Sequence, residues 1–171
     1  DTYFFFKGAS AQQVTYKLLD RFDEVMTPLK DKIAQSEFSL HQVLSLASIV
    51  QFESGNYEEM PKIAGVFMNR LHDDMMLQSS VTVCYALYDY KDWTECESAD
   101  SAKINSPYTT YQVVGLTPGP ILNPTGMAVE AVLDYTKHDY YYFIADVYGD
   151  NTVYYAATYE EHQKNIDKYL R

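Results

Sequence analysis

Glu53 is the residue of this sequence best placed to donate a proton, because it lies near the end of an otherwise apolar stretch from Leu46 to Gly55. Upstream, Ser39 and Gln42 match a capping box, and apolar residues follow at helical spacing. Apolar surroundings and the negative end of a helix both disfavour an ionised carboxylate. The pattern therefore predicts a helix that stops at Gly55 and keeps Glu53 protonated, as general-acid catalysis requires. The alternative interpretation is a glutamate at the helix end that extends its carboxylate to solvent or accepts hydrogen bonds from N–H groups.

Five further helices are expected from similar signals. Ser10 with Gln13 and Thr158 with Glu161 repeat the capping-box spacing, and Pro61 suits a first helical position. The stretch after Pro61 also carries an apolar stripe at helical spacing. The expected helices run from Ser10 toward Met26, from Pro61 to Leu71, from Ser79 or Ser80 to Leu87, around residues 127–133, and from Thr158 onward.

Two paired strands are expected near the end of the chain. The runs 140–147 and 152–157 are rich in aromatic and β-branched residues and flank a Tyr-Gly-Asp-Asn turn, residues 148–151. Residues 1–7, rich in Tyr and Phe, predict a further strand, whereas the polar and acidic residues 89–106 predict a surface excursion. The expected fold class is α+β: a mainly helical core around the glutamate-bearing helix, with a small antiparallel sheet that includes the C-terminal hairpin.

The composition narrows the classes of function. The 171 residues are 47% hydrophobic, which suffices for the core of one domain. A net charge of −11 argues against nucleic acid as a partner, because neutralising phosphates requires clustered Lys and Arg. The 4 histidines are scattered singly, so neither a metal site nor a cofactor is expected. The 17 tyrosines suit sugar rings and strand packing about equally.

Several motifs follow the glutamate in a definite order. They read Ile63-Ala-Gly-Val-Phe-Met-Asn-Arg-Leu71, Leu77-Gln-Ser-Ser-Val-Thr-Val-Cys-Tyr-Ala-Leu87, Ser106-Pro-Tyr-Thr-Thr-Tyr111 and Gly115-Leu-Thr-Pro-Gly-Pro-Ile-Leu-Asn-Pro124. Their order resembles the YceG-like (MltG) family of endolytic murein transglycosylases. The resemblance extends from Asp1-Thr-Tyr3 to Thr158-Tyr-Glu-Glu-His162 and so covers nearly the whole chain.

The resemblance implies a catalytic role for Glu53. In the family the segment matching residues 47–54 usually reads Ala-Ser-Ile-Val-Glu-Lys-Glu, and its second glutamate, the catalytic one, falls on Glu53. The first falls on Gln51, which leaves one ionisable group at this place. A family His that precedes the last strand is Val153 here.

The resemblance also implies a glycan groove beyond the glutamate. Residues 78–82, where the family reads Gln-Ser-Asp-Pro-Thr, offer donors for sugar hydroxyls or the N-acetyl group, or they simply cap a helix. For Tyr111 a core position is the alternative, and the asparagine before Pro124 fits a helix cap as well as a substrate contact. The candidate substrate contacts are Gln78, Ser79, Thr82, Tyr108, Thr110, Tyr111 and Asn123.

The implied reaction is cleavage of the β-1,4 bond between N-acetylmuramic acid and N-acetylglucosamine in nascent peptidoglycan strands. Glu53 would protonate the glycosidic oxygen. As a carboxylate it would then take the proton of the muramic C6 hydroxyl, which closes on C1 to give a 1,6-anhydro end. The alternatives are a noncatalytic peptidoglycan-binding module and an adaptor that binds cell-wall synthesis proteins.

The chain is interpreted as one catalytic domain, residues 1–171. In the family an N-terminal membrane anchor and a LysM-like region precede this domain, and both are expected to lie outside this sequence. The resemblance therefore implies a whole protein anchored by a single span at the extracytoplasmic face of the bacterial cell membrane. Cys84 and Cys96 are compatible with a disulfide in that compartment, and free thiols fit their spacing almost as well.

Overall fold

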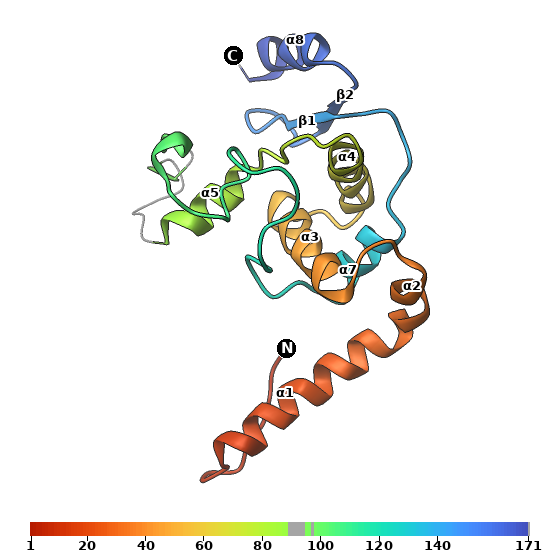
Figure 1. Ribbon diagram of the computed structural model, residues 1–171, viewed down its shortest axis with the longest axis vertical. Helices are drawn as coiled ribbons and strands as arrows, with labels where there is room; N and C mark the ends of the chain where they lie inside the picture. Colours follow the sequence, from red (N-terminus) through yellow and green to blue (C-terminus); the bar gives the residue numbers. More distant parts are fainter. Residues whose placement is uncertain (89–94, 97, 171) are drawn as a thin grey trace.

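The computed structural model describes residues 1–88, 95–96 and 98–170 (Figure 1). Its described helices are α1 (Ala11–Met26), the 3-10 helix η1 (Thr27–Leu29), α2 (Lys30–Gln35), α3 (Leu40–Glu53), α4 (Met60–His72), α5 (Ser80–Leu87), the 3-10 helix η2 (Ser101–Lys103), α7 (Gly126–Leu133) and α8 (Tyr159–Tyr169). Strands β1 (Tyr142–Ala145) and β2 (Val153–Ala156) pair antiparallel, with Phe143 opposite Tyr155. The expected α+β fold class is confirmed. Within the described ranges no helix is long and apolar enough to cross a membrane.

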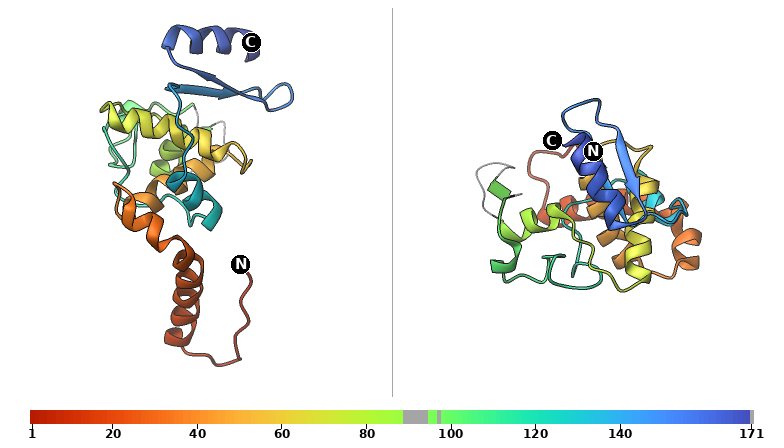
Figure 2. Two further views of the ribbon diagram at one scale, coloured as in Figure 1. Left: turned by 90° about the vertical axis from the view of Figure 1, so that its right-hand side faces the viewer. Right: turned by 90° about the horizontal axis from the view of Figure 1, so that it is seen from above.

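The elements lie in three tiers (Figures 1 and 2). Helix α8 covers the β1–β2 hairpin at one end, α3, α4, α5 and α7 lie in the middle, and α1 projects from the other end beside the N-terminal segment. Helix α3 packs against α7, α4 and α5, and α4 also contacts β1. The middle tier therefore holds the core, and α4 joins that core to the hairpin.

Helix α3 forms the centre of the middle tier. Every residue from Ser45 to Val50 is buried, and side chains such as Leu46 each stabilise the fold by about 1.5–3 kcal/mol when they leave water. The polar groups in this stretch have partners. Ser48 Oγ donates to the Ser45 carbonyl (2.7 Å) and accepts from the Ile121 N–H (2.9 Å). The second bond attaches the loop formed by residues 115–124 to α3.

The predicted capping boxes are confirmed. The hydroxyls of Ser10, Ser39 and Thr158 each accept the backbone N–H three residues on, and the Gln or Glu at that position accepts the backbone N–H of the cap. Pro61 lies in the first turn of α4, and the hairpin signal lies between β1 and β2, as predicted. These features involve only neighbouring residues, so the local sequence specifies them.

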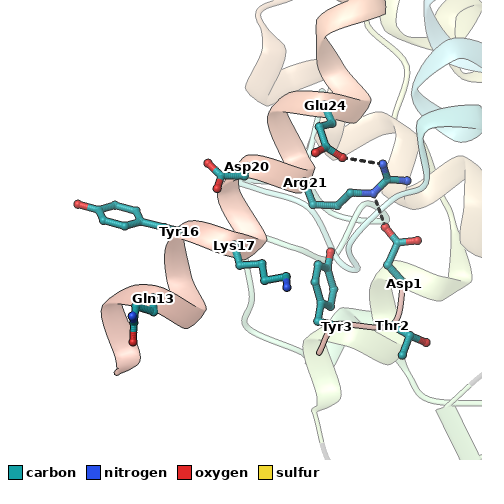
Figure 3. A pocket seen from close by; sticks show the side chains of 9 residues that line it. All are labelled: Asp1, Thr2, Tyr3, Gln13, Tyr16, Lys17, Asp20, Arg21 and Glu24. Atoms are coloured by element: carbon teal, nitrogen blue, oxygen red, sulfur yellow. Dashed lines mark hydrogen bonds and ion pairs between the residues drawn. The ribbon is translucent and has the colours of Figure 1, made fainter. Parts of the chain in front are cut away.

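The strand predicted for residues 1–7 is wrong. The segment has no strand structure and lies beside α1 (Figure 3), where Lys17 Nζ donates to the Phe4 carbonyl (2.9 Å) and Arg21 pairs with Asp1 (2.7 Å). The Phe4 side chain is 83% exposed. Aromatic residues favour a strand only where a neighbouring strand supplies a ladder, and β1 and β2 lie at the opposite end of the molecule.

Helix α3 ends earlier than its glycine signal predicts. Its last residue is Glu53, and Ser54 leaves the helix with extended angles (φ −136°, ψ 121°). Gly55 is not among the glycines with positive φ, so the helix ends without a left-handed glycine cap. The chain therefore turns away directly after Glu53, which is the terminal residue of the helix.

Cys84 and Cys96 form a disulfide, with their Cα atoms 5.1 Å apart. The bond joins α5 to the segment predicted as a surface excursion, residues 89–106. Residues 89–94 and 97 of that prediction lie outside the described residues. The described residues 98–106 are all exposed or half-buried, in agreement with it.

The segment after α7 crosses α4 directly over Gly65. The Thr136 carbonyl and the His138 ring occupy the space that a Cβ of Gly65 would need. His138 is held there because its Nε2 bonds the Lys62 carbonyl (2.9 Å) and its own carbonyl accepts from Asn69 Nδ2 (2.8 Å). The missing side chain thus lets the chain approach β1 across the surface of α4.

Replacing Gly65 with alanine is expected to destabilise the protein, because the new methyl group overlaps backbone that cannot retreat freely. Overpacking of this kind costs about 1–3 kcal/mol. Gly55→Ala is the matched control, since nothing lies within 4 Å of its Cβ position. Denaturant unfolding of the two variants measures this effect. Equal midpoints for Gly65→Ala and Gly55→Ala would contradict the close contact of Thr136 and His138 with Gly65.

Candidate active site

The Glu53 carboxylate, at the end of α3, interacts with residues from two other parts of the chain. Its Oε1 accepts a hydrogen bond from Ser79 Oγ, which precedes α5. The Arg70 guanidinium on α4 acts on the same carboxylate electrostatically. The side chain is half-buried. The purely apolar surroundings predicted for Glu53 are therefore not what the fold provides: a hydroxyl and a cation lie beside it.

A cavity of about 290 Å³ opens at this carboxylate. Helices α3, α4 and α8, the start of α5 and strand β1 all contribute to its walls. Its lining residues are Glu53, Phe67, Arg70, Leu77, Gln78, Ser80, Tyr111, Tyr142, Phe143, Ile144, Tyr159 and His162. One wall is aromatic and the remainder mixes donors, acceptors and one cation. This mixture suits a polar ligand with apolar faces.

A second, larger cavity lies far from this chemistry. It measures about 720 Å³ and lies between the N-terminal segment and α1, where Arg21 bridges Asp1 and Glu24 (Figure 3). None of the predicted site residues lines it. The smaller cavity is therefore the candidate active site.

Ser79 holds its position before α5 through its backbone. It is the N-cap residue of α5 in extended conformation, yet its hydroxyl makes no cap and instead donates to Glu53. The preceding residue, Gln78, has a left-handed backbone (φ 49°), an uncommon and costly state for a residue other than glycine. The Gln78 N–H donates to the Thr110 carbonyl (3.0 Å), which fixes this turn.

Thr82 and Thr110 lie behind Ser79 and have no exposed surface. The Ser79 N–H donates to Thr110 Oγ1 (3.0 Å), and Thr82 Oγ1 donates to the Ser79 carbonyl (2.7 Å). The two threonine oxygens lie 2.8 Å apart. Because the Thr82 proton points to the Ser79 carbonyl, Thr110 is the donor between them. Both threonines were predicted to contact substrate, but their burial places them away from the cavity surface.

The remaining predicted residues divide between the cavity and other places. Gln78 and Tyr111 line the cavity with Glu53. Tyr108 is half-buried and packs on Tyr85, with ring centroids 4.7 Å apart. Asn123 is exposed and is not among the lining residues. The structure thus brings together Glu53, Gln78, Ser79 and Tyr111, and leaves Tyr108 and Asn123 outside.

Arg70 is a site residue that the sequence interpretation missed. It is only 7% exposed, and it donates from Nε to the Tyr141 carbonyl (2.7 Å) and from Nη1 to the Leu77 carbonyl (2.5 Å). Its guanidinium carbon lies 5.2 Å from the Tyr142 ring centroid. Burial lowers its pKa, and the nearby Tyr142, Tyr111 and Glu53 oppose that shift. A single arginine in the apolar stripe of α4 was the available signal.

His162 is the second missed residue. Its ring stacks on Tyr142, with centroids 5.1 Å apart and planes at 24°. Its Nδ1 is buried and has no hydrogen-bond partner in the described part of the chain. Burial, and then the Arg70 charge, lower the pKa of His162 below its usual value. The imidazole is therefore held neutral in the cavity wall, and its position at the end of a family motif was the available signal.

Among the described residues, no group of three or more His, Cys, Asp or Glu side chains could hold a metal ion. The cavity has one carboxylate, one guanidinium, a neutral imidazole and several hydroxyl or amide groups. Such a set can transfer a proton and bind sugar-like hydroxyls.

The model of the YceG-like family matches residues 1–168. An endolytic murein transglycosylase of Streptococcus pneumoniae is 34% identical over 99% of this chain and 31% of its own length. A Bacillus subtilis protein of the same name is 35% identical over 94% of the chain and 43% of its own length. The crystal structure of a yceG-like protein from Listeria monocytogenes, 34% identical, superimposes with a TM-score of 0.83 over 95% of this chain and 52% of that one. The chain therefore spans less than half the length of the S. pneumoniae and B. subtilis relatives.

Stability is expected to fall on acidification through His162. The folded-state pKa lies below the unfolded value near 6.5, so the unfolded state binds more protons as the pH drops below that value. The contribution of the neutral His162 to the free energy of unfolding is complete above pH 6.5 and is lost as the pH falls through the folded-state pKa. Denaturant melts between about pH 7.5 and 5 should show a smaller acid loss for His162→Gln than for the wild type. Equal losses would contradict a buried neutral imidazole.

Proposed function

The chain belongs to the YceG-like family, and we propose that it is the catalytic domain, residues 1–171, of an endolytic murein transglycosylase that uses Glu53 as its acid. The observation that carries the proposal is the position of Glu53, the terminal residue of a buried helix and the only carboxylate among the described residues lining the cavity. The names of the S. pneumoniae and B. subtilis relatives point the same way.

The proposed reaction needs one carboxyl group. Glu53 gives its proton to the oxygen that links C1 of N-acetylmuramic acid to C4 of N-acetylglucosamine, and the C1–O bond breaks through an oxocarbenium-like state. The Glu53 carboxylate then takes the proton of the muramic C6 hydroxyl while O6 bonds to C1. The 1,6-anhydro ring forms, the acid is restored, and no water is consumed.

Hydrolysis is disfavoured by the surroundings of the other nearby acids. A hydrolase of the usual kind needs a second carboxylate roughly 5–9.5 Å from the first. Glu59 accepts from the Tyr155 hydroxyl (2.6 Å), and Asp73 accepts from the Tyr141 hydroxyl (2.5 Å). Neither lines the cavity, and neither does Glu58. The single-acid route is therefore the better fit.

The aromatic wall supports a sugar ligand. Tyr142 stacks on His162 and lies 5.9 Å from the Tyr159 ring, so these rings form one continuous face of the cavity. Aromatic faces pack well on the apolar faces of sugar rings, and polar lining groups such as Gln78 can bind hydroxyl or N-acetyl groups. A glycan strand is therefore the proposed partner.

The cellular setting is likewise proposed. Peptidoglycan lies outside the cytoplasm, so we propose that the whole protein lies at the extracytoplasmic face of the bacterial membrane, where the Cys84–Cys96 disulfide would be stable. A membrane anchor and contacts to cell-wall synthesis proteins would involve surfaces beyond the Glu53 cavity.

Replacing Glu53 with glutamine is expected to reduce the release of anhydromuramyl ends by at least about 100-fold, because the amide cannot donate the proton. Mass spectrometry of uncrosslinked glycan strands incubated with each protein measures this. Glu58→Gln, which alters an exposed glutamate nearby, should remain within about twofold of the wild type. Anhydro ends made equally well by Glu53→Gln, or reducing muramic ends made by the wild type, would sink the proposal.

A further inference from the structure

The hydroxyl of Ser79 is used in an unusual way. A serine at a helix N-cap normally accepts an N–H of the first turn, and the loss of such a cap costs about 1 kcal/mol. Ser79 leaves that role unfilled and donates to Glu53 Oε1 instead. Ser79 is 2% exposed, so the donor side of this bond is shielded from water. A cap is thus given up for a contact with the candidate acid.

Ser79 is itself held on both sides of its backbone. Thr110 Oγ1 accepts its N–H (3.0 Å), and Thr82 Oγ1 donates to its carbonyl (2.7 Å). The two threonine hydroxyls bond each other (2.8 Å), and the Thr110 N–H reaches Thr82 Oγ1 (3.3 Å). All these groups are buried. Buried networks with every member paired are rigid, because breaking one bond leaves an unpaired polar group.

We propose that Thr110, Thr82 and Ser79 form a positioning network for Glu53, in which Thr110 and Thr82 fix Ser79 and Ser79 fixes the Glu53 carboxylate for proton transfer. The inference rests on the proposed function for its effect on rate. Under this proposal, Thr82 and Thr110 position Ser79 and do not bind substrate. None of the three is a catalytic residue, since Ser79 reaches the reaction only through Glu53.

The network also distinguishes the two oxygens of Glu53. Oε1 accepts the hydrogen bond from Ser79. In the proposed network, the proton for transfer therefore belongs on Oε2. A glutamate side chain has three rotatable bonds, and a fixed Oε1 removes most of their freedom before substrate binds. Arg70 on α4 acts electrostatically on the carboxylate, and it remains in every variant below. Misplacing a reacting group by about 1 Å can cost 100-fold in rate.

The test compares substitutions at two adjacent threonines, both completely buried. Thr110→Val keeps the shape but removes the hydroxyl that accepts the Ser79 N–H, whereas Thr110→Ser keeps that hydroxyl. Thr109→Val is the matched control, because the Thr109 hydroxyl has no hydrogen-bond partner among the described residues. We expect Thr110→Val to lower kcat for anhydromuramyl product about tenfold with KM unchanged, and Thr110→Ser to restore most of it. Thr109→Val should resemble the wild type.

A second readout does not depend on activity. The side-chain carboxyl carbon of Glu53, followed by NMR during a pH titration, should show a higher midpoint in Thr110→Val and in Ser79→Ala than in Thr110→Ser or Thr109→Val. The reason is that a donated hydrogen bond stabilises the ionised carboxylate, and both of the first variants weaken it.

The outcomes separate the inference from the proposed function. A raised midpoint with no product from any protein, wild type included, would retain the network and reject the transglycosylase. Unchanged kcat and midpoint in Thr110→Val would overturn the network. So would an equal fall of kcat in Thr109→Val, because the effect would then be general loosening of the core.

Discussion

The structure depends on the burial of the central part of α3, residues 45–50, from all sides. Its central residues are removed from water by α4, α5 and α7, so the helix cannot rotate or slide without exposing apolar surface. This constraint gives the terminal residue of the helix a definite position at the edge of the core. Glu53 occupies that position. The backbone position of the acid is thus a consequence of helix packing.

The few polar residues of α3 connect the surrounding loops to it. Ser48 receives the Ile121 N–H, and Gln51 Oε1 accepts both the N–H (2.7 Å) and the hydroxyl (3.0 Å) of Thr125, the cap residue of α7. Gln51 stands where the family usually has glutamate. Its two bonds give this departure a structural role, because the amide oxygen anchors α7 without adding a second charge near Glu53.

The walls of the site come from segments far apart in the sequence. Arg70 donates to the carbonyls of Leu77 and Tyr141, and so ties the segment before α5 and the segment before β1 to α4. His162 from α8 then closes the aromatic wall by stacking on Tyr142. Burying an arginine is costly unless its N–H groups are paired, and these carbonyls supply that pairing. Arg70 therefore both stabilises the fold and supplies the positive charge in the cavity wall.

The sequence alone determined the features that depend on neighbouring residues. The capping boxes at Ser10, Ser39 and Thr158, the hairpin turn and the helix leading to Glu53 follow from spacings of a few residues, and the ordered motifs indicated the family.

Only the tertiary structure decided how the site is assembled, because the contacts of Ser79 with Glu53 and of Arg70 with Tyr141 join residues 26 and 71 positions apart. It diverted the Ser79 hydroxyl from its helix to Glu53, buried Thr82 and Thr110 behind it, and brought Arg70 and His162 into the cavity. It also left residues 1–7 without a strand to pair with. Local propensity carries no information about such partners, because the free energy of each contact exists only once the core has formed.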